Sequence, residues 1–132
     1  MSEQNVEVVR RGLAAWNAGH MDAIAEMHDP DAILRVPSEW PEAGPFVGRE
    51  AVMRQWTRLR ETWDADAVEP TTDYVDAGDR VVVRWRWWGQ AHDGADWTLE
   101  VTGVYTVRKG RFFHMEFFFD HDKALEAAGL HE

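Results

Sequence analysis

The chain has 132 residues, a length that fits one domain with a single core and one pocket inside it. Its 14 basic and 24 acidic residues give a formal net charge of −10, which excludes nucleic acid and anionic membranes as expected partners. It has no cysteine, hence no disulfide framework or thiolate metal site, and no apolar run near the ~20 residues that span a bilayer. We therefore predict a single domain over residues 1–132, soluble and cytoplasmic, with no metal and no cofactor.

The chain begins with two predicted helices. Residues at helical spacing predict a first helix over about 3–18, with Gly19 as its C-terminal cap; they are Val6, Val9, Leu13 and Trp16. A shorter helix follows, with Ile24, Met27 and His28 on its buried side. Asp29-Pro30 is expected to end it, because the residue before proline avoids the α region.

A strand over 32–36 leads into a loop over 37–48, which is rich in proline and glycine and contains Trp40. Beyond Gly48 a third helix is predicted to about Thr62, from the helical spacing of Val52, Trp56, Leu59 and Trp63. The C-terminal half then reads as strands over 68–75, 80–91, 97–107 and 112–119, the last three joined by tight turns into an antiparallel meander. A short helix over 121–129 closes the chain.

This order of elements, together with four segments, resembles the SnoaL-like branch of the nuclear transport factor two superfamily; the segments are AAWNAGHMDAIAEMHDPDA, GREAV, DAGDRVVV and FFDHDKALEAAGL. The resemblance implies an α+β fold. In that fold a cone-like barrel of curved mixed or antiparallel sheet wraps around three N-terminal helices, with a short C-terminal helix. It also implies a homodimer. Because related proteins catalyse different reactions or none, the fold does not specify the chemistry.

We compared the catalytic residues of related enzymes with the matching positions of this chain. Two charged residues remain as candidates for a catalytic role. Ketosteroid isomerase would need its acids at Gly12, Val36 and Gly103, none of which can transfer a proton. Limonene epoxide hydrolase resembles the chain at Asp120 and Arg86, but its other site residues fall on Trp88 or near Leu34 and Val36. Polyketide cyclases of the SnoaL type use an acid at the end of the last strand, which matches Asp120. The predicted catalytic pair is therefore Asp120 and Arg86.

Side chains alternate between the two faces of a strand, so the placement of Arg86 determines the face of every other residue on its strand. If Arg86 faces inward, so do Arg84 and Trp88, whereas Trp85 and Trp87 face outward. The other inward residues are Val101, Gly103, Tyr105 and Val107 on one strand and Phe113, Met115, Phe117 and Phe119 on the next. Strict alternation points Asp120 outward, so an inward Asp120 requires a bulge at Phe119. Arg84 is expected at the rim, in reach of water.

The resulting ligand-binding set comprises Trp16, His28, Leu34, Val36, Trp40, Trp56, Trp88, Tyr105, Met115, Phe117 and Phe119. Four of these have competing interpretations. Trp16 and Trp56, at helical spacing, are first of all core residues. His28 is more typical of a satisfied core histidine than of a base, and Trp40 has no periodicity that explains its packing, so it is a candidate lid over the pocket.

The opposite face would then form an apolar patch of Trp85, Trp87, Val104, Phe112 and Phe118, which predicts a homodimer through the outer face of the sheet. Two functions remain open. One is an isomerase, cyclase or hydrolase that acts on a small apolar or amphipathic molecule, with Asp120 as acid/base. The other is a non-catalytic ligand-binding or dimerisation module in which Asp120 caps the last helix and Arg86 is structural.

Overall fold

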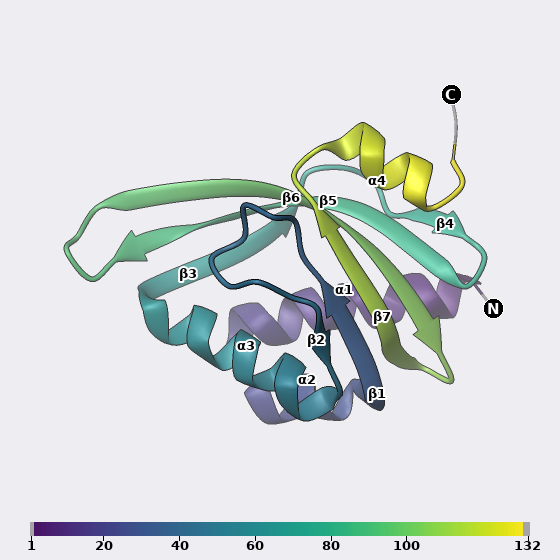
Figure 1. Ribbon diagram of the computed structural model, residues 1–132, viewed down its shortest axis with the longest axis horizontal. Helices are drawn as coiled ribbons and strands as arrows, with labels where there is room; N and C mark the ends of the chain where they lie inside the picture. The colour runs from purple at the N-terminus through teal and green to yellow at the C-terminus, as the bar shows by residue number, and fades with distance from the viewer. Residues whose placement is uncertain (1, 131–132) are drawn as a thin grey trace.

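The structure, a computed structural model, describes residues 2–130 and is α+β (Figure 1). Its helices are α1 (Ser2–Ala18), α2 (Met21–Glu26), α3 (Arg49–Thr62) and α4 (His121–Ala127). Its strands are β1 (His28–Arg35), β2 (Phe46–Val47), β3 (Trp63–Pro70), β4 (Val75–Ala77), β5 (Arg80–Ala91), β6 (Asp96–Arg108) and β7 (Arg111–Phe118). No helix within these described residues is long and apolar enough to cross a membrane.

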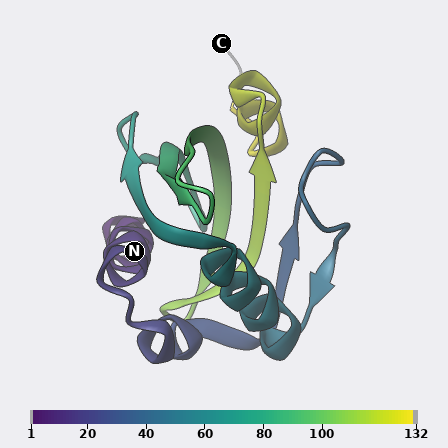
Figure 2. The same ribbon diagram turned by 90° about the vertical axis from the view of Figure 1, so that its left-hand side faces the viewer.

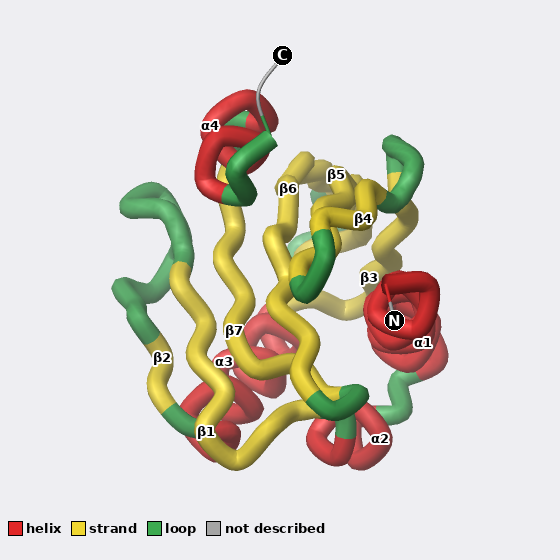
Figure 3. The backbone as a smooth tube through the Cα atoms, turned by 90° about the vertical axis from the view of Figure 1, so that its right-hand side faces the viewer, coloured by secondary structure: helices red, strands yellow, loops and turns green. Residues whose placement is uncertain are grey.

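The strands form one curved sheet in the order β2-β1-β7-β6-β5-β3, with β4 also paired to β5. The meander β5-β6-β7 is antiparallel as predicted, and β1 joins β7 in parallel, so the sheet is mixed. It is not closed into a barrel. Helices α1, α2 and α3 lie along its hollow side, whereas α4 lies against the opposite face (Figures 2 and 3). The predicted cone-like α+β architecture is confirmed.

Three local predictions differ from the structure. His28 was expected on the second helix, but that helix ends at Glu26 and His28 opens β1, where an irregular register between His28 and Ile33 accommodates Pro30. The expected loop over 37–48 contains the short strand β2. Trp63 begins β3 instead of extending α3, and the strand expected over 68–75 is two strands.

The predicted orientation of β5 is wrong. Trp85 and Trp87 are buried in the main core, whereas Arg86 is exposed and Trp88 only half-buried. The opposite choice would have buried the guanidinium groups of Arg84 and Arg86 in an apolar core, at a high desolvation cost. On β6 the predicted inward face is confirmed, because Val101 and Tyr105 are buried in the same core.

On β7 a bulge changes the alternation. The pairing with β6 shifts between Thr106 and Val107, so Phe112 is buried inward, and Phe113 instead contacts the Arg108 guanidinium on the outer side. The bulge therefore lies at the start of β7 and not at Phe119. Alternation resumes at Met115, which is buried as predicted.

The predicted apolar outer patch does not exist in this form. Trp85, Trp87 and Phe112 belong to the interior, and Val104 and Phe118 pack with α4 in a second small cluster. That cluster centres on Val82, Val104 and Ala124. The apolar patch therefore no longer supports a homodimer, which stays a prediction from the family resemblance.

Candidate ligand-binding cavity

An interior cavity of about 80 Å³ lies between the helices and the hollow side of the sheet. Its walls come from α1, α2, α3, the β1–β2 loop and five strands, β1, β3, β5, β6 and β7. The aromatic members of the wall are Trp16, Trp40, Trp56, Trp85, Trp87, Tyr105, Phe112 and Phe117. Aliphatic side chains, Gly12, His28 and Met115 complete it. No carboxylate or guanidinium lies among the described residues that line the cavity, so its chemistry is that of flat apolar surface.

The aromatic rings form a connected network. Trp87 lies edge-on to Trp16 at a ring-centroid distance of 6.3 Å, and Trp16 lies edge-on to Trp56 at 6.1 Å. Phe117 lies edge-on to Trp85 at 5.4 Å. Edge-to-face pairs in this range of distances add to the stability gained from burial and restrict ring rotation. The rings of Trp16, Trp56, Trp85, Trp87 and Phe117 therefore restrict one another's orientation.

His28 is a neutral, fully bonded part of the wall. Its Nδ1 lies 2.7 Å from the Ile24 carbonyl oxygen, so Nδ1 carries the proton, and the free Nε2 accepts from Trp56 Nε1 at 3.3 Å. Burial lowers the pKa of His28, and the charge of Arg49 lowers it further, against the opposing effect of the bond to Ile24. Both ring nitrogens are used, which agrees with the interpretation as a satisfied core histidine.

Tyr105 supplies a polar atom of different character. Its hydroxyl oxygen accepts a hydrogen bond from Trp85 Nε1 at 3.0 Å, which leaves the hydroxyl proton available for donation. Burial raises the pKa of Tyr105 above its ordinary value, so the phenol stays protonated. Gly103 makes room for the ring, because a Cβ atom there would lie 2.6 Å from it. Tyr105 can therefore donate one hydrogen bond to an occupant.

A buried carboxylate behind the wall orients two of the tryptophans. Asp66 accepts from Trp16 Nε1 at 2.6 Å and from Trp87 Nε1 at 2.8 Å, through the same oxygen. Its side chain is only 4% exposed, and the Arg60 guanidinium lies 3.9 Å from its other oxygen. Arg60 also covers the Trp16 ring, at 4.4 Å from the centroid. The carboxylate is thus fully engaged in positioning the wall.

The predicted ligand-binding residues divide into three groups. Those that line the cavity are Trp16, His28, Trp40, Trp56, Tyr105, Met115 and Phe117. Leu34 is fully buried in the core beside them, and Val36 and Phe119 pack on that core partly buried. Trp88 lies on the outer face of the sheet, where Arg86 covers its ring.

The two predicted catalytic residues do not meet at the cavity. The exposed Arg86 pairs with Glu69 on the outer face of the sheet. Asp120 is exposed and lies at the N-terminus of α4, where its Oδ1 accepts from the Lys123 amide at 3.1 Å. Asp120 therefore has the geometry of a helix N-cap, the competing interpretation from the sequence.

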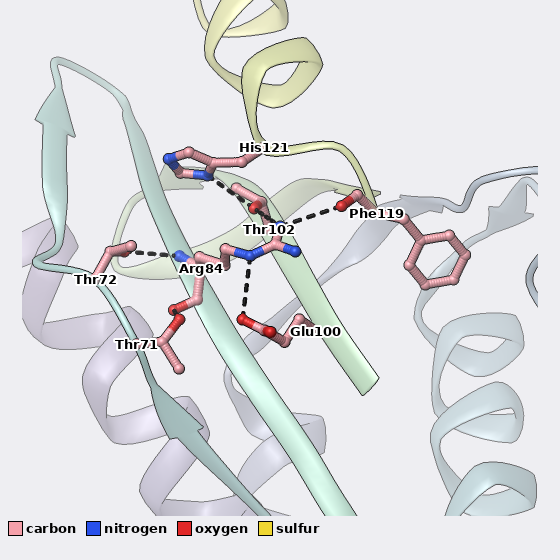
Figure 4. A network of polar contacts seen from close by, with 7 residues as sticks. All are labelled: Thr71, Thr72, Arg84, Glu100, Thr102, Phe119 and His121. Atoms are coloured by element: carbon pink, nitrogen blue, oxygen red, sulfur yellow. Dashed lines mark hydrogen bonds and ion pairs between the residues drawn. The ribbon is translucent and has the colours of Figure 1, made fainter. Parts of the chain in front are cut away.

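Arg84 shows how the chain is held as it turns into α4 (Figure 4). Its guanidinium donates to Thr102 Oγ1 at 2.8 Å and to the Phe119 carbonyl at 3.2 Å, and it pairs with Glu100 at 3.4 Å. The Thr102 hydroxyl in turn contacts His121 Nδ1 at 2.9 Å. The guanidinium is partly exposed, but it lies on the outer face of the sheet beside α4 and not on the predicted inward face, and it fixes the carbonyl immediately before Asp120.

Substitution of Asp120 tests whether its side chain serves as a helix N-cap or as a catalytic acid. We expect Asp120→Ala to lower the free energy of unfolding by about 1 kcal/mol and Asp120→Asn to leave it nearly unchanged, because asparagine caps helices as well as aspartate does. Urea denaturation measures both. The exposed Asp122 lies two residues further on, in the first turn of α4, and provides the matched control. We expect Asp122→Ala to lower the free energy of unfolding by less than Asp120→Ala does. Equal stability of the two Asp120 variants would contradict the capping role.

Two residues important for the site were not among the sequence candidates. Gln55 lies on the buried stripe of α3, three residues after Val52 and four before Leu59, and this spacing marks it as inward. Asp66 shares the face of β3 with the buried Val68, two positions away. In both cases the spacing of the neighbouring buried residues indicates an inward position, although the side chain is polar.

Comparison with known proteins agrees with this fold. Residues 9–115 match the SnoaL-like domain, and the chain belongs to that family. Among solved structures, Bal32a from a soil-derived mobile gene cassette is 28% identical, with a TM-score of 0.79 and 89% of each chain covered. No curated protein gave a significant match.

Two more distant structures share the fold. TerC, co-crystallised with polyporic acid, is 21% identical, with a TM-score of 0.76 over 96% of this chain and 98% of TerC. A candidate SnoaL-like polyketide cyclase from Jannaschia sp. CCS1 is 23% identical, with a TM-score of 0.76 over 89% of this chain and 85% of its own. At these identities the likeness concerns the fold alone.

Proposed function

We propose that this SnoaL-like protein binds a small, flat, mostly apolar molecule in its interior cavity, and that Asp120 and Arg86 are structural. The observation that carries this proposal is the aromatic wall, which lacks any carboxylate or guanidinium among its described residues. Small-molecule sites are typically apolar, with a few polar atoms that set orientation. Here the Tyr105 hydroxyl is such an atom.

The alternative of an enzyme with Asp120 as acid/base has less support. The carboxylate of Asp120 is bonded to the first turn of α4, and Arg86 is held by Glu69 on the outer side of the sheet. Burial raises the pKa of Tyr105, so its phenol stays protonated at neutral pH and is a poor general acid. Binding without proton transfer therefore fits the cavity better.

The size of the cavity limits the occupant. An apolar cavity of about 150 Å³ is known to bind benzene, so a space of about 80 Å³ is smaller than a single aromatic ring requires without adjustment. We infer that a wall residue moves when a ligand enters. The co-crystallisation of TerC with polyporic acid supports a small organic ligand for this fold.

Filling the cavity tests the function. Val9 lines it and is 1% exposed, whereas Val47 is 65% exposed, so Val9→Phe and Val47→Phe make the same chemical change inside and outside the site. We expect wild type and Val47→Phe to bind phenol and toluene equally in calorimetric titrations. We expect Val9→Phe to bind at least about tenfold more weakly, a difference of ~1.4 kcal/mol.

Overpacking by Val9→Phe is expected to cost about 1–3 kcal/mol of stability, so circular dichroism must show that the variant is folded. Unchanged affinity in a folded Val9→Phe protein would exclude the cavity as the binding site. Absence of binding to wild type would contradict the proposed function for ligands of this size.

A further inference from the structure

Trp40 is the single buried residue of the loop over 37–45, a stretch that the structure describes in full. Its side chain is 5% exposed and lines the cavity, while its neighbours Glu39 and Pro41 are exposed. Beyond this side chain, the loop is tied by a surface ion pair between Arg58 and Glu42. Exposed ion pairs shift a local equilibrium by at most about fivefold. The loop therefore depends mainly on one indole for its position.

The indole ring occupies a place that suits a flat molecule. It is nearly parallel to the Trp87 and Phe119 rings, with an interplanar angle of 24° in each case, at centroid distances of 6.4 and 6.2 Å. Phe117 contacts it at 5.8 Å. Its Nε1 donates to Gln55 Oε1 at 2.9 Å. The surroundings thus bind a planar ring through its faces and one edge.

The Trp40 ring bonds to only one of the two polar groups of the Gln55 side-chain amide. The residue is 1% exposed, and its Nε2 has no hydrogen-bond partner among the described residues. Because the indole can only donate, the amide oxygen must face it, so the orientation of the amide is determined. A buried amide nitrogen without a partner is unfavourable and rare in folded proteins. The amide therefore presents one acceptor, taken by Trp40, and one unused donor.

We propose that Trp40 occupies a subsite of the ligand and is displaced when the ligand binds. The expected ligand is a planar, fused-ring molecule whose edge carries a hydrogen-bond donor beside an acceptor, as in a lactam or a hydroxy-substituted carbonyl. Such an edge pairs with both amide atoms of Gln55, whereas the indole pairs with one. This inference rests on the proposed binding function, and it accounts for the wall movement that the small cavity requires.

Three fused-ring compounds of similar size test the proposal in calorimetric titrations of wild type. Carbostyril, the lactam of quinoline, has the donor and the acceptor; indole has the donor; naphthalene has neither. We expect affinity to fall in that order, by about three- to tenfold per hydrogen bond. Gln55→Leu should bring the three affinities together.

The variant Trp40→Phe distinguishes a displaced ring from a fixed wall. Phenylalanine has no N–H group and fills less space, so it competes less well for the subsite, and we expect carbostyril to bind at least about threefold more tightly. A fixed wall would instead lose contacts, and binding would weaken. If Gln55→Leu does not fold, the double variant Trp40→Phe/Gln55→Leu removes both polar partners together and should show no preference among the compounds.

The outcomes separate the two proposals. Equal affinity of wild type for all three compounds, with no gain in Trp40→Phe, would leave apolar binding intact and overturn the displacement of Trp40. Weaker carbostyril binding by Trp40→Phe would overturn it as well. Failure of all three compounds to bind wild type would overturn both the inference and the binding function on which it rests.

Discussion

Asp66→Leu is expected to lower the free energy of unfolding by about 3–5 kcal/mol, one of the two largest losses we predict. The substitution removes the carboxylate oxygen that accepts from both Trp16 and Trp87. Two indole N–H groups in the interior then lose their acceptor. It also removes the carboxylate near Arg60. Urea denaturation of both proteins measures the difference.

Two further variants make the test specific. Asp66→Asn keeps the shape and one acceptor oxygen, so we expect a smaller loss of about 1–2 kcal/mol. Asp96→Ala, at an exposed position of β6, should stay within about 0.5 kcal/mol of wild type. A loss below about 1 kcal/mol for Asp66→Leu would show that the carboxylate does not hold the two tryptophans in place.

Trp87→Ala is expected to cost about 3–5 kcal/mol, because it removes a buried ring at the centre of the aromatic network. That ring contacts Trp16, Trp40, Trp63 and Trp97 at centroid distances from 4.9 to 6.4 Å. Thermal and urea unfolding measure the loss, and near-UV circular dichroism should show reduced aromatic signals.

The adjacent Trp88 is the matched control. Trp88→Ala makes the same change one residue further along β5, on the outer face, where the ring is half-buried and covered by Arg86. We expect a loss of about 1 kcal/mol. Equal losses for the two substitutions would contradict the assignment of faces on this strand.

Most elements of the fold could be predicted because their patterns are long and periodic. The helix over 3–18 and the meander of three strands follow directly from spacing and turn residues. Boundaries were less predictable where elements meet without a turn. Trp63 continues the helical spacing of α3 but begins β3, and His28 continues that of α2 but begins β1.

The candidate site was predictable in its apolar part and not in its charged part. Trp16, Trp56 and Tyr105 were assigned to the pocket from periodicity, and they line the cavity. Arg86 was assigned inward through the family resemblance, and alternation then turned Trp85 and Trp87 outward. The cost of burying arginine supports the opposite face, and that physical argument decides between the two.

Gln55 and Asp66 show a different limit. Both occupy positions that periodicity marks as buried, but their polarity argues against burial unless partners are known. The partners are indole N–H groups from distant parts of the sequence, Trp40 for Gln55 and Trp16 and Trp87 for Asp66. Such pairings follow from the tertiary structure and not from any local pattern.

The segment Trp85-Arg86-Trp87-Trp88 places large rings on both faces of β5, so hydrophobic alternation alone defines the strand register weakly. Polar contacts to β3 distinguish between the two possible orientations of β5. Asp66 accepts from Trp87 on the inner side, and Glu69 pairs with Arg86 on the outer side. A slip of one residue would break both interactions and bury Arg86. These two contacts, one buried and one exposed, therefore favour the observed register of β5 over a pairing that is shifted by one residue.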